Sequence, residues 1–469
     1  MVFSSLTFVF FFLPAVFLLY FPVRNRTWRN GVLLAASLVF YSWGEPRHII
    51  LMLASTAVAY LGGIGMSETE IKGQKKLNTV IYVVTLVLLT SSLFVFKYLN
   101  LVVSTAESLT GTEYGFKRIA LPIGISFYTF QILSYVIDLH RGKVTLQRNP
   151  LRLLLYVSFF PQLIAGPIVR YQTVENEITE RKESVSDIEY GLKRFIIGLA
   201  KKVLLANNIS AYMNIIYGME PDKCGTAILW IAAAAYTVQI YYDFSGYSDM
   251  AIGLGRIFGF HFLENFDYPY YTFSITEYWR KWHISLSSWF RDYIYIPLGG
   301  NRVGKARWVL NILIVWALTG LWHGAEWNFP LWGIYYGVIL VAEKLFLGKL
   351  LERLPKPVRW LYMFTMITIG FVLFNITDPE KYLDVMRRMF AFAPTDWHGV
   401  ISSSINIVKT SIWMPLGLLF IFPVKRIIRT GGDSALFKAA EYAFYLALFV
   451  LCIIYMLSTT YNPFIYFRF

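Results

Sequence analysis

Long runs of uncharged, mostly apolar residues recur along the whole chain and are separated by short polar segments. A helix needs about 20 such residues to cross the hydrocarbon core of a bilayer. Short alternating strands, which would indicate a membrane barrel, are absent from the pattern. The pattern therefore predicts an all-α polytopic membrane protein with about ten to thirteen membrane helices. The long runs are 1–23, 77–96, 119–137, 153–169, 225–242, 308–325, 357–377 (broken by Arg359) and 442–467, and the shorter ones are 31–44, 49–67, 327–342 and 410–424.

Composition agrees with a membrane protein, because only 15% of the residues are charged, against about 25% in an ordinary soluble domain. The net charge of +14 is spread over short basic turns such as 66–76 and 425–438, which we expect on the cytoplasmic side. No basic soluble domain exists, which argues against nucleic-acid binding. The first basic cluster, 24–29, follows the first apolar run, which argues against a cleaved signal peptide and places the N-terminus outside.

No linker divides the chain, so we expect one membrane domain over residues 1–469, with a catalytic core at about 119–345. Within that core, the apolar segment 119–169 is interrupted by helix breakers. Broken helices at membrane depth are tolerated where the backbone is buried in protein or lines a cavity. The segments 121–128 and 160–167 are therefore candidate half-helices, although kinked packing helices fit the same pattern. The breakers are Pro122, Gly124, Pro161, Gly166 and Pro167.

His323 lies at the end of an apolar run and is preceded by Trp322. An ionisable side chain at membrane depth is rare and marks a functional site by default. If the segment is helical, Glu326 and Trp327 share a face with His323. Trp322 and Trp327 are then candidates to form a dry pocket around the imidazole, which is suited to general-base chemistry near neutral pH.

A second notable block spans residues 274–302. The capping box 274–277 predicts a helix that continues to the turn before Pro297, with Trp279, His283 and Ser287 on one face. Basic residues are dense here, which suits either a cytoplasmic edge or a phosphate-rich ligand. Arg280, Arg291 and Arg302 are the candidate phosphate-binding residues.

The segment 239–270 carries Asp243 and Asp249, six positions apart, so one helix face does not hold both. We expect Asp243 to accept hydrogen bonds that fix the fold, and we keep it and Asn265 among the candidate substrate-binding residues. His261 is expected to be structural or interfacial. No group of residues has metal-ligand spacing, and Cys224 and Cys452 are too far apart in sequence to suggest a disulfide framework.

Taken together, these blocks resemble the membrane-bound O-acyltransferase family, and within it the branch of alginate O-acetyltransferase membrane subunits and related polysaccharide acetyltransferases. The resemblance runs through 242–249, 265–270, 274–302 and 320–327, and extends to the closing segment 463–469. It implies helices ringed around a thinned centre with a funnel or tunnel, where acyl donor and acceptor meet from opposite sides.

The resemblance also implies roles and partners. The catalytic histidine falls on His323, and a second important position falls on His283. Cytoplasmic acetyl-CoA is the implied donor, with no permanently bound cofactor. The implied acceptor is an extracytoplasmic, serine-hydrolase-like (SGNH-type) protein that passes the acetyl group to a polysaccharide. The implied location is a bacterial inner or plasma membrane, spanned many times and surrounded by lipid.

Three alternatives remain open from the sequence. D-alanyl transfer to teichoic acid keeps the family but takes its acyl group from a carrier protein. A non-enzymatic transporter would explain the broken helices at 119–169. A non-catalytic scaffold for export is the third. The residues also leave open whether His323 acts as a general base or carries the acetyl group itself.

Overall fold

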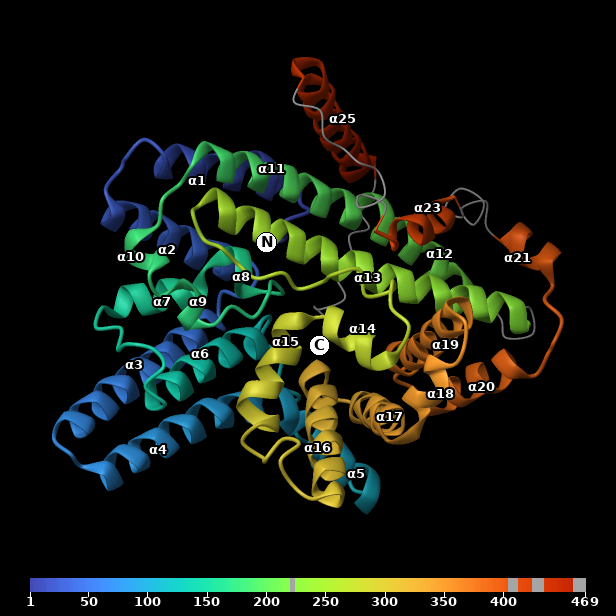
Figure 1. Cartoon of the computed structure of the whole chain (residues 1–469), viewed down its shortest axis with the longest axis horizontal. Coiled ribbons are helices and arrows are strands. Elements are labelled where there is room, and N and C mark those ends of the chain that lie inside the picture. Colours follow the sequence, from blue (N-terminus) through green and yellow to red (C-terminus); the bar gives the residue numbers. More distant parts are fainter. Residues whose placement is uncertain (220–223, 404–411, 424–433, 459–469) are drawn as a thin grey trace. The chain divides into compact units, whose positions relative to one another are not determined.

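The computed structural model describes residues 1–219, 224–403, 412–423 and 434–458 (Figure 1). Every regular element in these ranges is a helix, so the predicted all-α class is confirmed. Four of the helical stretches are long and apolar enough to cross a bilayer: Ile49–Ile71, Lys75–Thr110, Lys356–Asn375 and Ala435–Ser458. The larger number of spans stays a prediction. Most of the basic turn 425–438 and all of the closing segment 463–469 lie outside the described residues.

The chain forms two compact units. Unit 1 comprises residues 1–195 and 248–263, and unit 2 comprises 196–247 and 264–468. The 32-residue helix α13 (Thr226–Ile257) begins in unit 2 and ends in unit 1. The single-domain organisation with a core at 119–345 stays a prediction.

Unit 1 is built from helices of very different length. The apolar runs at 31–44, 49–67 and 77–96 overlap most of α2, α3 and α4. The elements are the π-helical turn η1 (Phe8–Phe12), α1 (Leu13–Tyr20), α2 (Arg26–Ser42), α3 (Ile49–Ile71), α4 (Lys75–Leu93), η2 (Phe94–Tyr98), α5 (Leu99–Thr110), α6 (Ile125–His140), α7 (Pro150–Ser158), α8 (Phe160–Leu163), α9 (Tyr171–Val174), α10 (Glu177–Glu180) and α11 (Val185–Ala200), whose last turn belongs to unit 2.

The helix breaks predicted within 119–169 are present in unit 1. Helix α6 begins only after Gly124, which has a left-handed φ of +75°. A Cβ at Gly124 would lie 3.1 Å from the carbonyl oxygen of Leu163, so the start of α6 packs directly against the end of α8. Nearly every side chain of α6 is buried. The broken backbone therefore lies inside protein, the environment in which such breaks are tolerated.

Charged side chains in unit 1 form a group that we call the arginine cluster, in which three arginines share one carboxylate. It contains Arg26, Arg29 and Arg181 around the carboxylate of Glu183. Arg26 and Arg29 each place an Nη1 atom 2.6 Å from a Glu183 carboxylate oxygen. The Arg181 side chain is fully buried and donates to Asn30 Oδ1 at 2.7 Å. This cluster fixes the polar stretch 170–194 onto the first two helices.

Unit 2 carries the remaining elements. They are η3 (Lys201–Ala206), α12 (Asn207–Tyr217), most of α13, α14 (Ile275–Lys281), α15 (Ile284–Phe290), the π-helical turn η5 (Arg291–Tyr295), α16 (Lys305–His323), α17 (Asn328–Ala342), η6 (Glu343–Leu347), α18 (Gly348–Glu352), α19 (Lys356–Asn375), α20 (Pro379–Phe390), α21 (Trp397–Ser403), α23 (Trp413–Phe420) and α25 (Ala435–Ser458).

Helices α16 and α17 pack against one another at glycines. A Cβ at Gly320 would overlap the carbonyl oxygen of Phe329, and a Cβ at Gly333 would overlap that of Trp316. Small residues let helix backbones approach this closely. The pair holds the C-terminal end of α16, where His323 lies, against the start of α17.

Candidate active site

The site is built around the short helix α14, whose N-terminus is fully capped. Ser274 Oγ accepts a hydrogen bond from the Glu277 N–H at 3.1 Å, as the capping box predicts. The buried carboxylate of Glu343 accepts the N–H groups of Ile275 and Thr276, each at 2.8 Å. The first N–H groups of a helix lack partners within the helix, so Glu343 anchors α14 to η6. Glu343 is absent from the sequence-based candidates, although a carboxylate directly after the uncharged run 327–342 was a signal.

The single helix expected to run from 275 to the turn before Pro297 is wrong. Helix α14 ends at Lys281, and His283 adopts a left-handed conformation, with φ 45° and ψ 55°, before α15 begins. This conformation costs a residue with a Cβ roughly 1–2 kcal/mol. Trp279, His283 and Ser287 nevertheless line the same cavity. They meet there because of the break between two helices and not because of a shared helical face.

The His283 imidazole is 2% exposed and lies among aromatic rings. The Phe244 ring packs edge-on at 4.5 Å and the Trp322 ring lies at 5.7 Å, measured between ring centroids. Nδ1 lies 3.1 Å from the side-chain oxygen of Asn265. Burial lowers the pKa of His283 well below its ordinary value, and the nearby His323 adds to this effect. The imidazole is therefore neutral at physiological pH.

His323 is the last residue of α16 and is 5% exposed. Its ring lies 5.0 Å from the rings of Trp322 and Trp332 and 5.3 Å from that of Phe374. The helix ends at this residue, so the face expected to join His323 with Glu326 and Trp327 does not form. Trp332 and Phe374, which sequence reasoning missed, form the aromatic surroundings instead.

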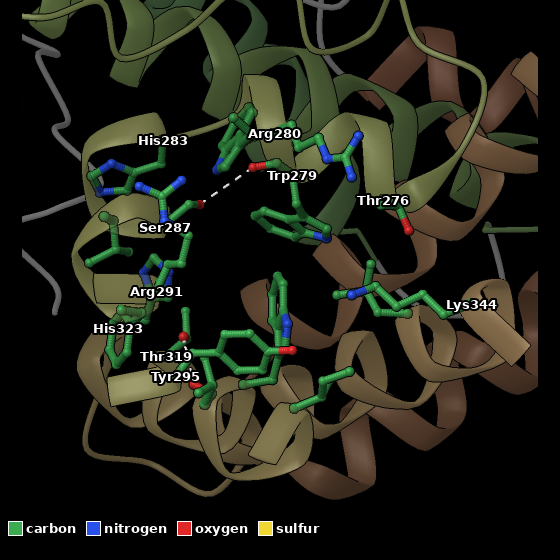
Figure 2. Close-up of a pocket in the computed structure, with 17 residues that line it drawn as sticks. Thr276, Trp279, Arg280, His283, Ser287, Arg291, Tyr295, Thr319, His323 and Lys344 are labelled. Atoms are coloured by element: carbon green, nitrogen blue, oxygen red, sulfur yellow. Dashed lines mark hydrogen bonds between the residues drawn. The ribbon is translucent and has the colours of Figure 1, made fainter. Parts of the chain in front are cut away.

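Both histidines line one cavity of about 260 Å³ in unit 2, shown in Figure 2. Its walls come from α14, α15, η5, α16, α17 and η6. Apolar and aromatic side chains dominate the walls, with hydroxyl groups between them. The lining residues are Thr276, Trp279, Arg280, Trp282, His283, Leu286, Ser287, Phe290, Arg291, Tyr295, Ile312, Val315, Trp316, Thr319, His323, Leu340 and Lys344.

Three basic side chains, Arg280, Arg291 and Lys344, line the cavity and are each exposed; we call them the cationic rim. In Figure 2, Lys344 enters from the side opposite His283 and His323. No carboxylate lines the cavity. Arg291 pairs with its neighbour Asp292, whereas no carboxylate in the described ranges pairs with Arg280 or Lys344. Burial lowers the pKa of Lys344, and the charge of Arg280 lowers it further. The rim is suited to an anionic ligand.

Lys344 is absent from the sequence-based candidates, and Arg302 is placed differently from the expectation. Arg302 is exposed and is not among the residues that line the cavity. Trp327 is 59% exposed and also lies outside the lining. Trp322 is buried and contacts both imidazole rings from behind the cavity wall.

The two remaining candidates are buried in unit 2 without lining the cavity. Asp243 is fully buried and its carboxylate lies 2.6 Å from the Lys202 ammonium. The structural role expected of Asp243 stays a prediction. Asn265 is fully buried and contacts His283. Both therefore reach the site through other residues: Asp243 precedes Phe244, whose ring packs on His283.

The remaining residues singled out from the sequence are His261, Asp249, Cys224 and Cys452, and none of them lines the cavity. His261 Nδ1 lies 2.7 Å from Glu177 Oε1, and Asp249 pairs with Arg194 at 2.7 Å. Both interactions are structural. Cys224 and Cys452 are buried and do not form a disulfide. Within the described part of the chain, no group of three or more His, Cys, Asp or Glu residues has the arrangement of a metal site.

The sequence of this chain is similar to those of known proteins. The family model of the membrane-bound O-acyltransferase family matches residues 38–383. The "Probable alginate O-acetylase AlgI" of Azotobacter vinelandii is 40% identical over 85% of this chain and 79% of its own length. The protein of the same name in Pseudomonas putida is 35% identical over the whole of both chains. The "Peptidoglycan O-acetyltransferase" of Helicobacter pylori is 32% identical over 83% of this chain and 80% of its own length. The chain therefore belongs to the membrane-bound O-acyltransferase family and is a membrane-embedded O-acyltransferase.

Proposed function

We propose that this protein transfers an acetyl group from cytoplasmic acetyl-CoA to the hydroxyl of an extracytoplasmic acceptor, as a step in polysaccharide O-acetylation. One observation carries the proposal: a single cavity joins two buried imidazoles to a cationic rim without any lining carboxylate. The imidazoles supply proton transfer. The rim supplies a binding surface for the phosphates of the donor.

In this proposal His323 is the general base. It accepts the proton of the acceptor hydroxyl as the hydroxyl oxygen attacks the thioester carbonyl. The carbon–sulfur bond then breaks, and the leaving thiolate takes up the proton from His323. A positioned base of this kind contributes roughly 10²–10⁴-fold to the rate. The rings of Trp322, Trp332 and Phe374 limit the access of water, which would otherwise hydrolyse the thioester.

The cavity dimensions favour a short acyl group. Pockets that enclose drug-sized ligands have volumes of roughly 300–1,000 Å³, and this cavity has about 260 Å³. It is suited to the reacting end of a thioester and not to a whole coenzyme A. The nucleotide part of the donor would then remain outside, with its phosphates near Arg280 and Lys344, the two rim cations that no described carboxylate neutralises.

The relatives support the class of acceptor that we propose. Their names include alginate and peptidoglycan acetylation, and we extend polysaccharide acetylation to this chain. We take the immediate acceptor to be an SGNH-type protein with a nucleophilic serine outside the membrane. The protein would span a bacterial cell membrane many times, with the rim facing the cytoplasm.

The test uses the purified protein with radiolabelled acetyl-CoA, and in parallel with a D-alanyl-loaded carrier protein. We expect thioester cleavage or acetyl transfer from acetyl-CoA. Cleavage of only the D-alanyl thioester would show that the donor is the carrier protein and not acetyl-CoA. Passage of a solute across the membrane of proteoliposomes, with neither thioester cleaved, would show that the protein is a transporter and not an enzyme.

A further inference from the structure

The side-chain oxygen of Asn265 receives three hydrogen-bond donors at the turn that carries His283. It lies 3.2 Å from the Ser285 backbone nitrogen, 2.9 Å from Ser285 Oγ and 3.1 Å from His283 Nδ1. The Asn265 backbone carbonyl also accepts the Ile284 N–H at 3.0 Å. Asn265 thus contacts both residues that follow the left-handed His283 as well as His283 itself.

These contacts determine which nitrogen of His283 carries the proton. A backbone N–H can only donate, so the Asn265 atom that faces Ser285 must be the amide oxygen. An amide oxygen can only accept, so the Nδ1 atom beside it must carry a hydrogen. In a neutral imidazole the lone pair then lies on Nε2. This Nε2 is buried and has no hydrogen-bond partner within the described chain, and His283 lines the cavity.

We propose that Asn265 is a positioning residue that holds His283 as the Nδ1–H tautomer, with Nε2 as a hydrogen-bond acceptor for a hydroxyl or thiol proton in the cavity. The inference deepens the proposed function and relies on it for the reaction, while the tautomer assignment rests on the contacts alone. It also explains how the left-handed turn is maintained. The Asn265 side-chain oxygen accepts the donors of His283 and Ser285, and the Asn265 backbone carbonyl accepts the N–H of Ile284.

Few charged groups lie where they could affect the protonation of His283. From α16, His323 acts on it electrostatically. From α13 and η3, the Asp243–Lys202 pair is self-neutralised. Arg280 and Arg291 line the same cavity but belong to its exposed rim. Within the described residues no carboxylate hydrogen-bonds to His283, so a carboxylate introduced at position 265 would be the first.

The test is Asn265→Asp, which keeps an oxygen acceptor and adds a negative charge. The carboxylate stabilises the protonated imidazole and therefore raises the pKa of His283. Because the role proposed for Nε2 requires a neutral His283, the acid limb of the pH–kcat profile should move up by about one pH unit or more, with activity regained at higher pH. Asn265→Ala should lower kcat about tenfold or more at every pH, since a free imidazole is no longer held in one tautomer.

A second measurement tests the inference without relying on turnover of acetyl-CoA. Diethyl pyrocarbonate modifies neutral imidazole, and mass spectrometry of the His283 peptide reports the extent at each pH. The pH at which His283 is half-maximally modified should rise in Asn265→Asp, even if acetyl-CoA proves to be the wrong donor. Asn149→Asp is the matched control, because the side-chain oxygen of the exposed Asn149 also accepts backbone N–H groups, those of Leu151 and Arg152. Unchanged midpoints and pH profiles in Asn265→Asp, with the protein folded, would overturn the inference.

Discussion

The arginine cluster of unit 1 and the cationic rim of unit 2 gather similar side chains and use them differently. In the cluster, Glu183 lies within 2.6 Å of both Arg26 and Arg29, and the guanidinium of Arg181 is buried with backbone and amide partners. In the rim, Arg280 and Lys344 face a cavity that no carboxylate lines. Density of basic residues in the sequence does not distinguish these cases.

The difference shows what to look for in a chain with a large positive charge. A basic group that is paired with a carboxylate within the protein contributes to folding, and breaking a buried pair leaves a costly uncompensated charge. A basic group left without a counterion beside a cavity is available to a ligand. We therefore expect changes in the cluster to affect stability and changes in the cavity to affect turnover or donor binding.

The largest expected effect is on turnover. His323→Ala should lower kcat by roughly 10²–10⁴-fold, because the proposed general base is lost. The melting temperature should fall modestly, because Ala leaves a cavity where the imidazole packs against aromatic rings. Radiolabelled acetyl-CoA turnover and thermal unfolding in detergent measure the two quantities. His261→Ala, which removes a histidine of unit 1, is the control; normal turnover in His323→Ala would end its catalytic assignment.

The second effect is on stability. Glu183→Gln leaves Arg26, Arg29 and Arg181 without their carboxylate and should destabilise the protein by roughly 2–3 kcal/mol. We place this below the cost of a fully enclosed pair because Arg26 is partly exposed. Thermal unfolding reports the loss, and the KM for acetyl-CoA in the surviving protein should not change. Glu180→Gln, at an exposed neighbouring carboxylate, is the control. A large change in KM would show that the cluster is not purely structural.

The third effect is on donor binding. Lys344→Gln removes one rim cation and should raise the KM for acetyl-CoA about tenfold, the size of a single partly exposed charge-assisted contact. Neither kcat nor the melting temperature should change much. Lys349→Gln, at an exposed lysine of α18 outside the cavity, should behave like wild type. An unaltered KM in Lys344→Gln would mean that the rim does not contact the donor.

The smallest effect is the acid sensitivity of unit 1. Burial opposes ionisation of Glu183, but hydrogen bonds from Arg26 and Tyr20 and the charges of Arg26 and Arg29 lower its pKa overall. The unfolded chain therefore binds more protons, and the stabilisation is lost as pH falls through the folded-state pKa. The melting temperature should decline below about pH 4.5, and less steeply in Glu183→Gln. Equal slopes would exclude Glu183 as a source of the decline.

Local patterns allowed much of the fold and part of the site to be predicted. The helical class followed from the apolar runs, and the breaks near Gly124 followed from residues that cannot continue a helix. The start of α14 followed from the capping box at 274–277. Each of these depends on residues within one or two turns of one another.

Tertiary contacts decided what the sequence missed. The left-handed turn at His283 depends on Asn265, 18 positions upstream, and no local pattern marks a histidine for that conformation. Glu343 and Lys344 reach the site from η6, directly after α17 and about 60 positions beyond the helix that Glu343 caps. Trp327 and Arg302 looked plausible because they lie near His323 and His283 in sequence, yet the chain turns both towards the surface.

The glycine contact between α16 and α17 bears on how this enzyme could be re-engineered. With Gly320 and Gly333 in backbone contact, the two helices cannot spread apart to admit a bulkier substrate without losing that contact. Room for a longer acyl chain would have to come from shortening a side chain of the wall, with Trp316 the obvious choice. The range of acyl groups that the cavity accepts is therefore set by the size of the side chains that line it, because the backbones of α16 and α17 are held in contact.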